Sequence, residues 1–116
     1  MMTDVSKKIE EIEWEPHFMT DNGSLRWIYT RERDDAPMSV VEVLLRKGVT
    51  LPDHVHQDQP DLIYVLAGKA TMFIQGEEEF PLGPGKVVMV PPNTLHAIRN
   101  VEEDLYVYNV FTPPIK

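Results

Sequence analysis

Cysteine is absent from the 116 residues of this chain, which excludes disulfides, thiolate metal ligands and thiol nucleophiles together. A metal site in this chain would therefore have to be built from histidine and carboxylate side chains. Long apolar runs are also missing, since no hydrophobic stretch approaches the length of a membrane-spanning helix. We expect no membrane partner.

Basic residues are scarce as well: 11 Lys and Arg stand against 19 Asp and Glu, for a formal net charge of -8. Nucleic-acid binding draws on clustered Lys and Arg, so DNA and RNA are poor candidates as partners. The first residues carry acidic side chains where a secretory signal has an apolar core. A cytoplasmic location is the resulting expectation.

Short apolar segments separated by Gly and Pro recur along the chain, and no helical period is long enough to bury a face. Most of the ten prolines fall at these breaks or at the tail. The pattern predicts an all-β domain of about eight to ten strands. So many strands must close into a small antiparallel barrel or jelly roll, because an open sheet would leave long reactive edges.

The expected division of the chain is an N-terminal arm with a first strand at residues 1–20, followed by one barrel domain at residues 21–116. Residues 31–35 are expected to form a loop, and residues 67–69 a tight turn between two strands. The strands expected in the barrel domain are residues 25–30, 39–45, 49–56, 62–66, 70–75, 78–82, 87–90, 95–99 and 105–111.

Three of the four histidines lie in stretches that could form a metal site. His54 and His56 are separated by one residue, so on a strand their rings point to the same face. Asp61 follows at the head of an apolar run, and His96 lies in a second stretch punctuated by Gly and Pro. These three imidazoles and one carboxylate are the candidate metal ligands. His17 lies outside both stretches and is assigned no role.

The spacing of the first stretch resembles a known sequence motif. From Gly48, five residues lead to His54, one to His56, four to Asp61 and six to Gly68. This arrangement is similar to the first motif of the cupin superfamily at every spacing. A lone His-x-His pair would be weak evidence of a metal site, since such pairs are common.

The second stretch resembles the second cupin motif, which strengthens the first resemblance. Gly85 is followed after five residues by Pro91, and Asn93 by His96 after two and Asn100 after six. The resemblance implies a double-stranded β-helix barrel of the jelly-roll type. It also implies a divalent metal held inside the barrel by His54, the other two motif histidines and the acidic position; Fe, Mn, Ni, Zn, Co and Cu all suit such ligands.

Two positions depart from the usual cupin pattern. Asn93 stands where glycine is frequent, and asparagine is the non-glycine residue most tolerant of positive φ, so the turn should survive. Asp61 stands where glutamate is usual, and its reach is shorter by about 1.3–1.5 Å. Asp61 could then ligate directly, ligate through a water, or be replaced by Asp58 on the loop after His56.

Alternate side chains of a strand share one face, so Ile63, Val65 and Ile98 should point inward with the candidate ligands. They would then form an apolar cavity wall around the metal. We therefore expect a small-molecule substrate or ligand, and a metal-dependent enzyme with dioxygenase-like chemistry placed ahead of isomerase or lyase chemistry. Candidates for a general base beyond the ligands are few, and none has a clear position in the sequence: Tyr64, Tyr108, Arg26 and Gln59.

Two other functions remain open. One is a non-catalytic cupin that binds a sugar or another metabolite through its metal, and the other is a barrel that holds metal weakly. The sequence also predicts a homodimer, in which the aromatic segment around Trp14, Phe18 and Trp27 packs against a partner barrel.

Overall fold

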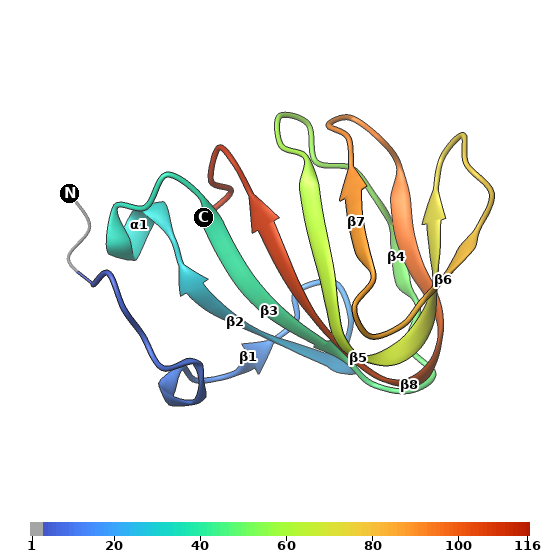
Figure 1. Cartoon of the computed structure of the whole chain (residues 1–116), viewed down its shortest axis with the longest axis horizontal. Coiled ribbons are helices and arrows are strands. Elements are labelled where there is room, and N and C mark those ends of the chain that lie inside the picture. The colour runs from blue at the N-terminus through green and yellow to red at the C-terminus, as the bar shows by residue number, and fades with distance from the viewer. Residues whose placement is uncertain (1–3) are drawn as a thin grey trace.

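Figure 1 shows the computed structural model of the chain, in which residues 4–116 are described. The described residues form one antiparallel sheet system of eight strands, which confirms the expected all-β jelly-roll fold. The elements in chain order are a 3₁₀ turn (Ile9–Glu11), β1 (Glu15–Pro16), β2 (Gly23–Tyr29), α1 (Arg31–Asp34), β3 (Ser39–Leu45), β4 (Leu51–His54), β5 (Asp61–Ile74), β6 (Phe80–Leu82), β7 (Val87–Val90) and β8 (His96–Phe111).

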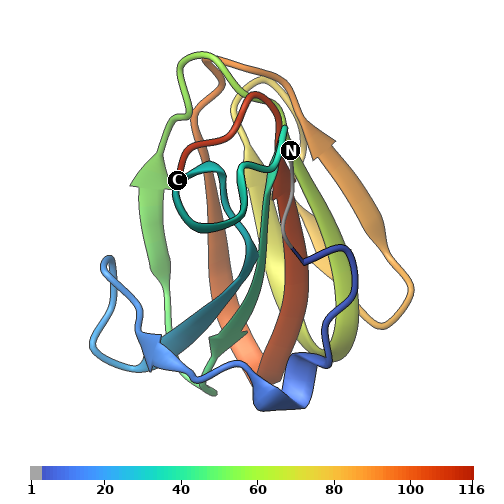
Figure 2. The same cartoon turned by 90° about the vertical axis from the view of Figure 1, so that its left-hand side faces the viewer.

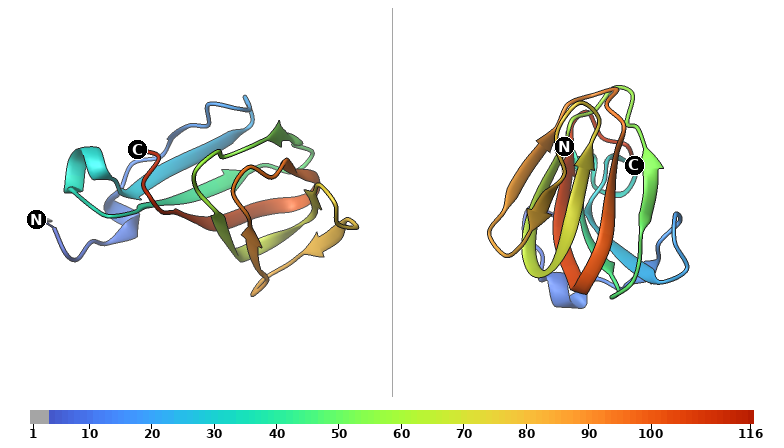
Figure 3. Two further views of the ribbon diagram at one scale, coloured as in Figure 1. Left: turned by 90° about the horizontal axis from the view of Figure 1, so that it is seen from above. Right: turned by 90° about the vertical axis from the view of Figure 1, so that its right-hand side faces the viewer.

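The two longest strands, β5 and β8, pair along their whole lengths and form the β5/β8 ribbon. At one end of the ribbon Asp61 lies opposite Phe111, and at the other end Ile74 lies opposite His96. Strands β7 and β3 flank the half of the ribbon that contains Asp61, and β4 and β6 flank the other half. The ribbon bends in its middle, so its two halves belong to facing walls of the barrel (Figures 2 and 3).

The expected turn at residues 67–69 is wrong, because β5 runs through these residues without a break. Gly68 has φ +96, and a Cβ atom built there would collide with the backbone carbonyl of Asp104 on β8. The register between β5 and β8 also shifts on both sides of Gly68. Glycine therefore marks a close approach of two strands at the bend of the ribbon, and not a chain reversal.

The expected separation of residues 95–99 from residues 105–111 is also wrong, since both lie in the single strand β8. Asn100 has φ 51, a left-handed conformation in which the backbone turns while the strand continues. Asn93 has φ 58, so the expected tolerance of asparagine in that turn is confirmed.

The segment that was expected to be a loop at residues 31–35 begins with the single turn of α1. Thr30 caps this turn, because its side-chain oxygen accepts a hydrogen bond from the Arg33 N–H at 3.0 Å. Asp34 accepts a hydrogen bond from Lys7 at 2.7 Å, which fixes the N-terminal arm against α1. Residues 1–3 of the expected arm lie outside the described residues, and the domain division at residue 20 stays a prediction.

A core of Val, Leu, Ile and Met side chains fills the space between the two walls. Ile63, Val65 and Ile98 point into this core, as the strand alternation predicted, but only Ile63 and Ile98 line the cavity beside the candidate ligands. Trp27 belongs to it as well, so its ring is not part of an outer surface for a partner barrel. No helix in residues 4–116 has the length and apolar character needed to cross a lipid bilayer.

Candidate metal centre

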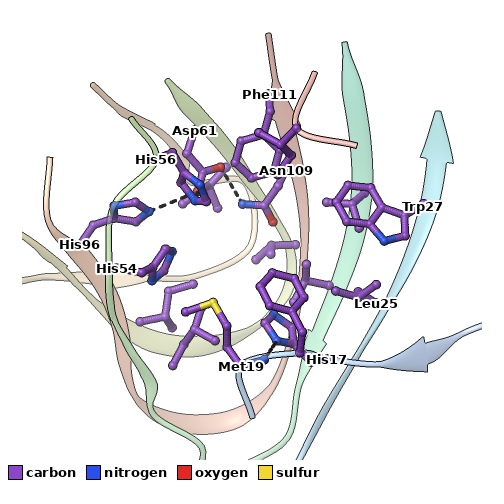
Figure 4. A pocket seen from close by; sticks show the side chains of 18 residues that line it. His17, Met19, Leu25, Trp27, His54, His56, Asp61, His96, Asn109 and Phe111 are labelled. Atoms are coloured by element: carbon purple, nitrogen blue, oxygen red, sulfur yellow. Dashed lines mark hydrogen bonds and ion pairs between the residues drawn. The ribbon is translucent and has the colours of Figure 1, made fainter. Parts of the chain in front are cut away.

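The structure brings all four candidate ligands together at one end of the barrel interior. His54 ends β4, His56 follows in the next loop, Asp61 begins β5 and His96 begins β8. One potential ligand atom from each residue lies within 4.8 Å of all the others. Figure 4 shows the three rings and the carboxylate gathered around one point.

His56 reaches this point from a loop, whereas the sequence placed it on a strand over residues 49–56. Among the described strands, β4 pairs only with β8, and its last pair is His54 opposite His96, the first residue of β8. Beyond His54 no partner strand remains, so the chain leaves the sheet. The ring of His56 is then fixed by an edge contact with Phe111, whose ring centroid lies 4.8 Å away.

Backbone carbonyls set the tautomers of two of the histidines. Nδ1 of His54 lies 2.8 Å from the carbonyl oxygen of Pro52, and Nδ1 of His96 lies 2.8 Å from that of Thr94. A carbonyl oxygen can only accept, so Nδ1 carries the hydrogen in both rings and Nε2 keeps a free lone pair. Histidines that bind a metal through Nε2 usually donate from Nδ1 in this way, which fixes the orientation of the ring.

One buried atom in this cluster makes no hydrogen bond. Among the residues that the structure describes, Nε2 of His96 is the only buried side-chain nitrogen or oxygen without a hydrogen bond. A buried polar atom left unsatisfied costs about 1–3 kcal/mol. A metal ion bound to its lone pair would remove that cost, so the residues present fit a metal.

Asn109 positions the short carboxylate of Asp61. Its side-chain N–H group donates to Oδ1 of Asp61 at 2.8 Å, which leaves Oδ2 at 3.4 Å from Nε2 of His96 and 3.8 Å from Nε2 of His56. Two ligands bound at about 2.1 Å from one ion lie about 3.0 Å apart at a right angle and about 4.2 Å apart when opposite. The separations of Oδ2 from both nitrogens fall in this range.

Asp58, the possible replacement, is exposed and does not join the cluster, whereas Asp61 is only 3 % exposed. Asp61 is the first residue of β5, and the fold places the start of this strand close to the histidines. This position compensates for the methylene that aspartate lacks relative to glutamate. Direct ligation by Asp61 stays a prediction.

Burial sets the charge state of the rings. Loss of solvent lowers the pKa of His54 below its ordinary value, and burial likewise lowers the pKa of His56 although the nearby Asp61 opposes this shift. Both rings are therefore neutral near pH 7. Neutral imidazole is the form that binds a metal ion, so no proton has to be displaced from these two rings.

The four residues line one side of a cavity of about 60 Å³ whose remaining wall is almost entirely apolar (Figure 4). No Lys or Arg is among the described residues that line it. Phe18 lines the cavity while 74 % of its surface stays exposed, so it stands at the opening. The other apolar lining residues are Met19, Leu25, Trp27, Val41, Val43, Leu51, Ile63, Ile98, Val107, Phe111 and Ile115.

Two polar residues of the cavity were missed by the sequence reasoning: His17 and Asn109. For Asn109 a signal existed, since it occupies an inward position of a strand whose inward neighbours Val107 and Phe111 are apolar. For His17 there was none, because strand β1 is two residues long and nothing local shows that the arm covers the barrel opening.

The general-base candidates named from the sequence do not line the cavity. Arg26 forms an ion pair with Glu42 at 2.7 Å, and Tyr108 lies opposite Glu42 on the neighbouring strand. Tyr64 is 42 % exposed, and Gln59 lies half-buried in the loop before β5. Their absence from the cavity removes them from the candidate site.

Comparison with known proteins extends the likeness beyond the two motifs. An uncharacterised protein of Streptomyces coelicolor is 33 % identical over 107 residues, which cover 92 % of this chain and 94 % of that protein. Quercetin 2,3-dioxygenase of Bacillus subtilis is 34 % identical over 81 residues, or 70 % of this chain. The matched part is only 24 % of the length of that dioxygenase.

Solved structures show the same architecture. The ectoine synthase from P. lautus superposes with a TM-score of 0.83 at 20 % identity, covering 97 % of this chain and 80 % of that one. The family model described as the cupin domain matches residues 40–111, from β3 to the end of β8. The chain therefore belongs to the cupin family.

Proposed function

We propose that this protein is a divalent-metal-dependent enzyme that acts on a small organic molecule, with dioxygenase chemistry as the first candidate. The observation that carries the proposal is the cluster of three imidazoles and one carboxylate, with an unpartnered buried Nε2, facing an apolar cavity. A divalent metal held there by His54, His56, Asp61 and His96 would supply Lewis acidity and, for Fe, Mn, Ni or Cu, reactivity toward O₂.

The cavity wall sets the kind of substrate. Its apolar side chains exclude bulk water and can pack against an apolar part of a substrate. None of the described residues that line the cavity is a Lys or Arg. A phosphate group would find no cationic side chain there, and a sugar would find few hydrogen-bonding groups. These features support a neutral or singly charged substrate and weigh against a sugar-binding cupin.

The size of the cavity limits the size of the substrate. Sites that enclose drug-sized ligands measure about 300–1,000 Å³. The present cavity of about 60 Å³ is far smaller, so quercetin, the molecule after which the Bacillus subtilis relative is named, would not be enclosed. Small enols and phenols are better candidates.

Dioxygenase chemistry is placed ahead of isomerase or lyase chemistry because the described cavity lining offers no free general base. Outside the four candidate ligands, no described lining residue offers a carboxylate. The one further imidazole, His17, has its Nδ1 lone pair engaged by the Met19 N–H at 3.0 Å. A proton abstraction would therefore lack a free base, whereas activation of a metal-chelating substrate needs none.

Oxygen uptake tests the proposal. The protein is loaded anaerobically with Fe(II), Mn(II), Ni(II), Co(II), Cu(II) or Zn(II) and mixed with small enediols and catechols. We expect uptake with at least one redox-active metal and none with Zn(II). No uptake with any of them would remove the dioxygenase assignment.

Metal content separates the remaining alternatives. Elemental analysis of the purified protein is compared with that of a His54→Ala, His96→Ala double variant. Substoichiometric metal in the wild type would favour a barrel that holds metal weakly, and full metal without turnover would favour a non-catalytic metabolite-binding cupin. Equal metal in both proteins would end the proposal of a metal site.

A further inference from the structure

The fourth histidine, His17, is buried in the cavity wall although it belongs to the N-terminal arm. Only 8 % of its surface is exposed, and its ring stacks on Phe18 with centroids 5.0 Å apart. Its backbone N–H donates to the carbonyl of Gly23 at 3.1 Å, which continues the pairing of β1 with β2. Backbone and ring are both held in place.

The tautomer of His17 is the opposite of that found in His54 and His96. Its Nδ1 lies 3.0 Å from the backbone nitrogen of Met19, and a backbone N–H can only donate. Nδ1 is therefore the acceptor, and in the neutral ring the hydrogen sits on Nε2. The two ligand histidines present a lone pair from Nε2, whereas His17 presents a donor from the same atom.

This donor has no partner among residues 4–116. No hydrogen bond to Nε2 of His17 exists among the described residues, and the only buried unpartnered side-chain atom there is Nε2 of His96. Nε2 of His17 is therefore reached by solvent. Because the ring lines the cavity and is otherwise covered, that solvent is inside the cavity or at its opening.

The position of His17 relative to the cluster would bring its donor close to a molecule bound at the metal. His17 lies across the cavity from Asp61 and His96 (Figure 4), next to Phe18 at the opening. A molecule bound to a metal at the cluster and extending through the apolar space toward the opening would pass His17. Along that path the Nε2–H of His17 is a donor that is fixed by its tautomer and that the described residues leave without a partner.

We propose that His17 is a specificity-determining residue, which donates a hydrogen bond from Nε2 to an acceptor oxygen on the end of the substrate remote from the metal. The substrate class is then a metal-binding head group, an apolar spacer and a carbonyl or similar oxygen at the tail. This inference rests on the proposed function, because it uses the metal-bound orientation of the substrate.

The tautomer is tested first, in the protein without metal. Long-range ¹H–¹⁵N correlation spectra distinguish imidazoles protonated on Nδ1 from those protonated on Nε2. We expect the Nε2–H form for His17 and the Nδ1–H form for His54 and His96. An Nδ1–H form of His17 would overturn the inference whatever the protein does with metals.

Ligand binding tests the role itself. Pentanohydroxamate and 4-oxopentanohydroxamate share a metal-binding head group and differ by one ketone oxygen on the tail. With Zn(II)-loaded wild type we expect the ketone compound to bind about tenfold more tightly, as for one added hydrogen bond. His17→Phe should lose this preference and still bind pentanohydroxamate, which also shows that the variant is folded.

The control variant is Met19→Leu, which changes a neighbouring wall residue and keeps the imidazole. It should keep the preference for the ketone compound. A preference that survives in His17→Phe, or one that is absent from the wild type, would overturn the role of His17. Failure of both hydroxamates to bind any metal-loaded protein would instead contradict the proposed function.

Discussion

Asn109 and Asp61 lie 48 positions apart in the sequence and meet at the candidate metal centre through one buried hydrogen bond of 2.8 Å. The bond holds Oδ1 of the carboxylate and directs Oδ2 toward Nε2 of His96 and His56. A carboxylate shorter than the one usual in cupins is thereby positioned by a residue from the far end of β8.

Replacing Asn109 with leucine should weaken metal binding. The substitution keeps the approximate volume and removes the donor, so Asp61 loses its orientation and one buried hydrogen bond. Loss of a group that orients a metal ligand costs about 10–100-fold in metal affinity, and an unsatisfied buried acceptor about 1–3 kcal/mol of stability. Co(II) titration followed by visible absorption measures the affinity. Val110→Leu, at the next position of β8 and half-buried on the other face of the strand, is the control, and an unchanged affinity in Asn109→Leu would contradict the positioning role.

A matched pair of substitutions decides which aspartate serves the metal. Asp61→Asn removes a charge beside the three imidazoles and should lower metal affinity by at least about tenfold. Asp58→Asn removes the same charge from an exposed loop position and should leave affinity unchanged. Isothermal titration with Zn(II) compares the two. The reverse result would assign the ligand to Asp58.

The bend of the β5/β8 ribbon should depend on glycine at position 68. Gly68→Ala adds a Cβ atom that collides with the Asp104 carbonyl at a residue with φ +96, so we expect a loss of more than about 2 kcal/mol in unfolding free energy. Gly83→Ala meets no atom within 4 Å and has no such φ, and should change stability by less than about 1 kcal/mol. Urea unfolding followed by tryptophan fluorescence gives both values. Equal effects would contradict the close approach described above.

The contact between the arm and α1 should make stability depend on pH. Burial raises the pKa of Asp34, but hydrogen bonds from Lys7, Thr30 and Arg33 outweigh it and bring the pKa below the ordinary value of 3.8. The carboxylate therefore stabilises the fold fully above about pH 4, and this contribution disappears as the pH falls through the lowered pKa.

Asp34→Asn measures this contribution. Hydrogen bonds to charged groups are each worth about 1.5–3 kcal/mol, so the variant should be less stable than the wild type at pH 7 by about that amount. The difference should shrink below pH 4. Glu32→Gln, at an exposed position of the same turn, is the control and should differ little from the wild type at any pH. If the difference in stability between Asp34→Asn and wild type grew on acidification, the expected direction of the pH dependence would be wrong.

The homodimer stays a prediction, but its expected surface changes. Trp27 lines the cavity, whereas Tyr64, Val87 and Met89 are exposed by 42 %, 57 % and 56 % on paired strands β5 and β7. A second copy covering these side chains would remove them from water. Light scattering at micromolar concentration should give a dimer for wild type and for Gln75→Glu, and a monomer for the Val87→Glu, Met89→Glu double variant. A wild-type monomer would contradict the prediction.

The sequence predicted the parts of the site that local spacing determines. The separation of His54 from Asp61 and the turn that precedes His96 are each set within a short segment, and the meeting of the two segments was implied by the resemblance to cupins. The structure groups these residues as expected.

What the sequence did not predict depends on the path of the chain in three dimensions. Gly68 was interpreted as a turn because glycine with positive φ serves both turns and close strand contacts, and only the position of Asp104 distinguishes them. His17 enters the cavity only because the arm crosses the opening of the barrel, and no periodicity in its two-residue strand indicates this.

The bend of the β5/β8 ribbon couples metal binding to the stability of the longest pairing in the molecule. Asp61 and His96 begin its two strands at opposite ends of the ribbon, and the fold brings those ends together into one cluster of potential ligand atoms. Fraying at either end would separate these atoms. An ion bound between them would therefore stabilise the paired state of both ends. Release of that ion should then coincide with cooperative opening of the β5/β8 ribbon, and amide hydrogen exchange along β5 and β8 should slow as metal is added.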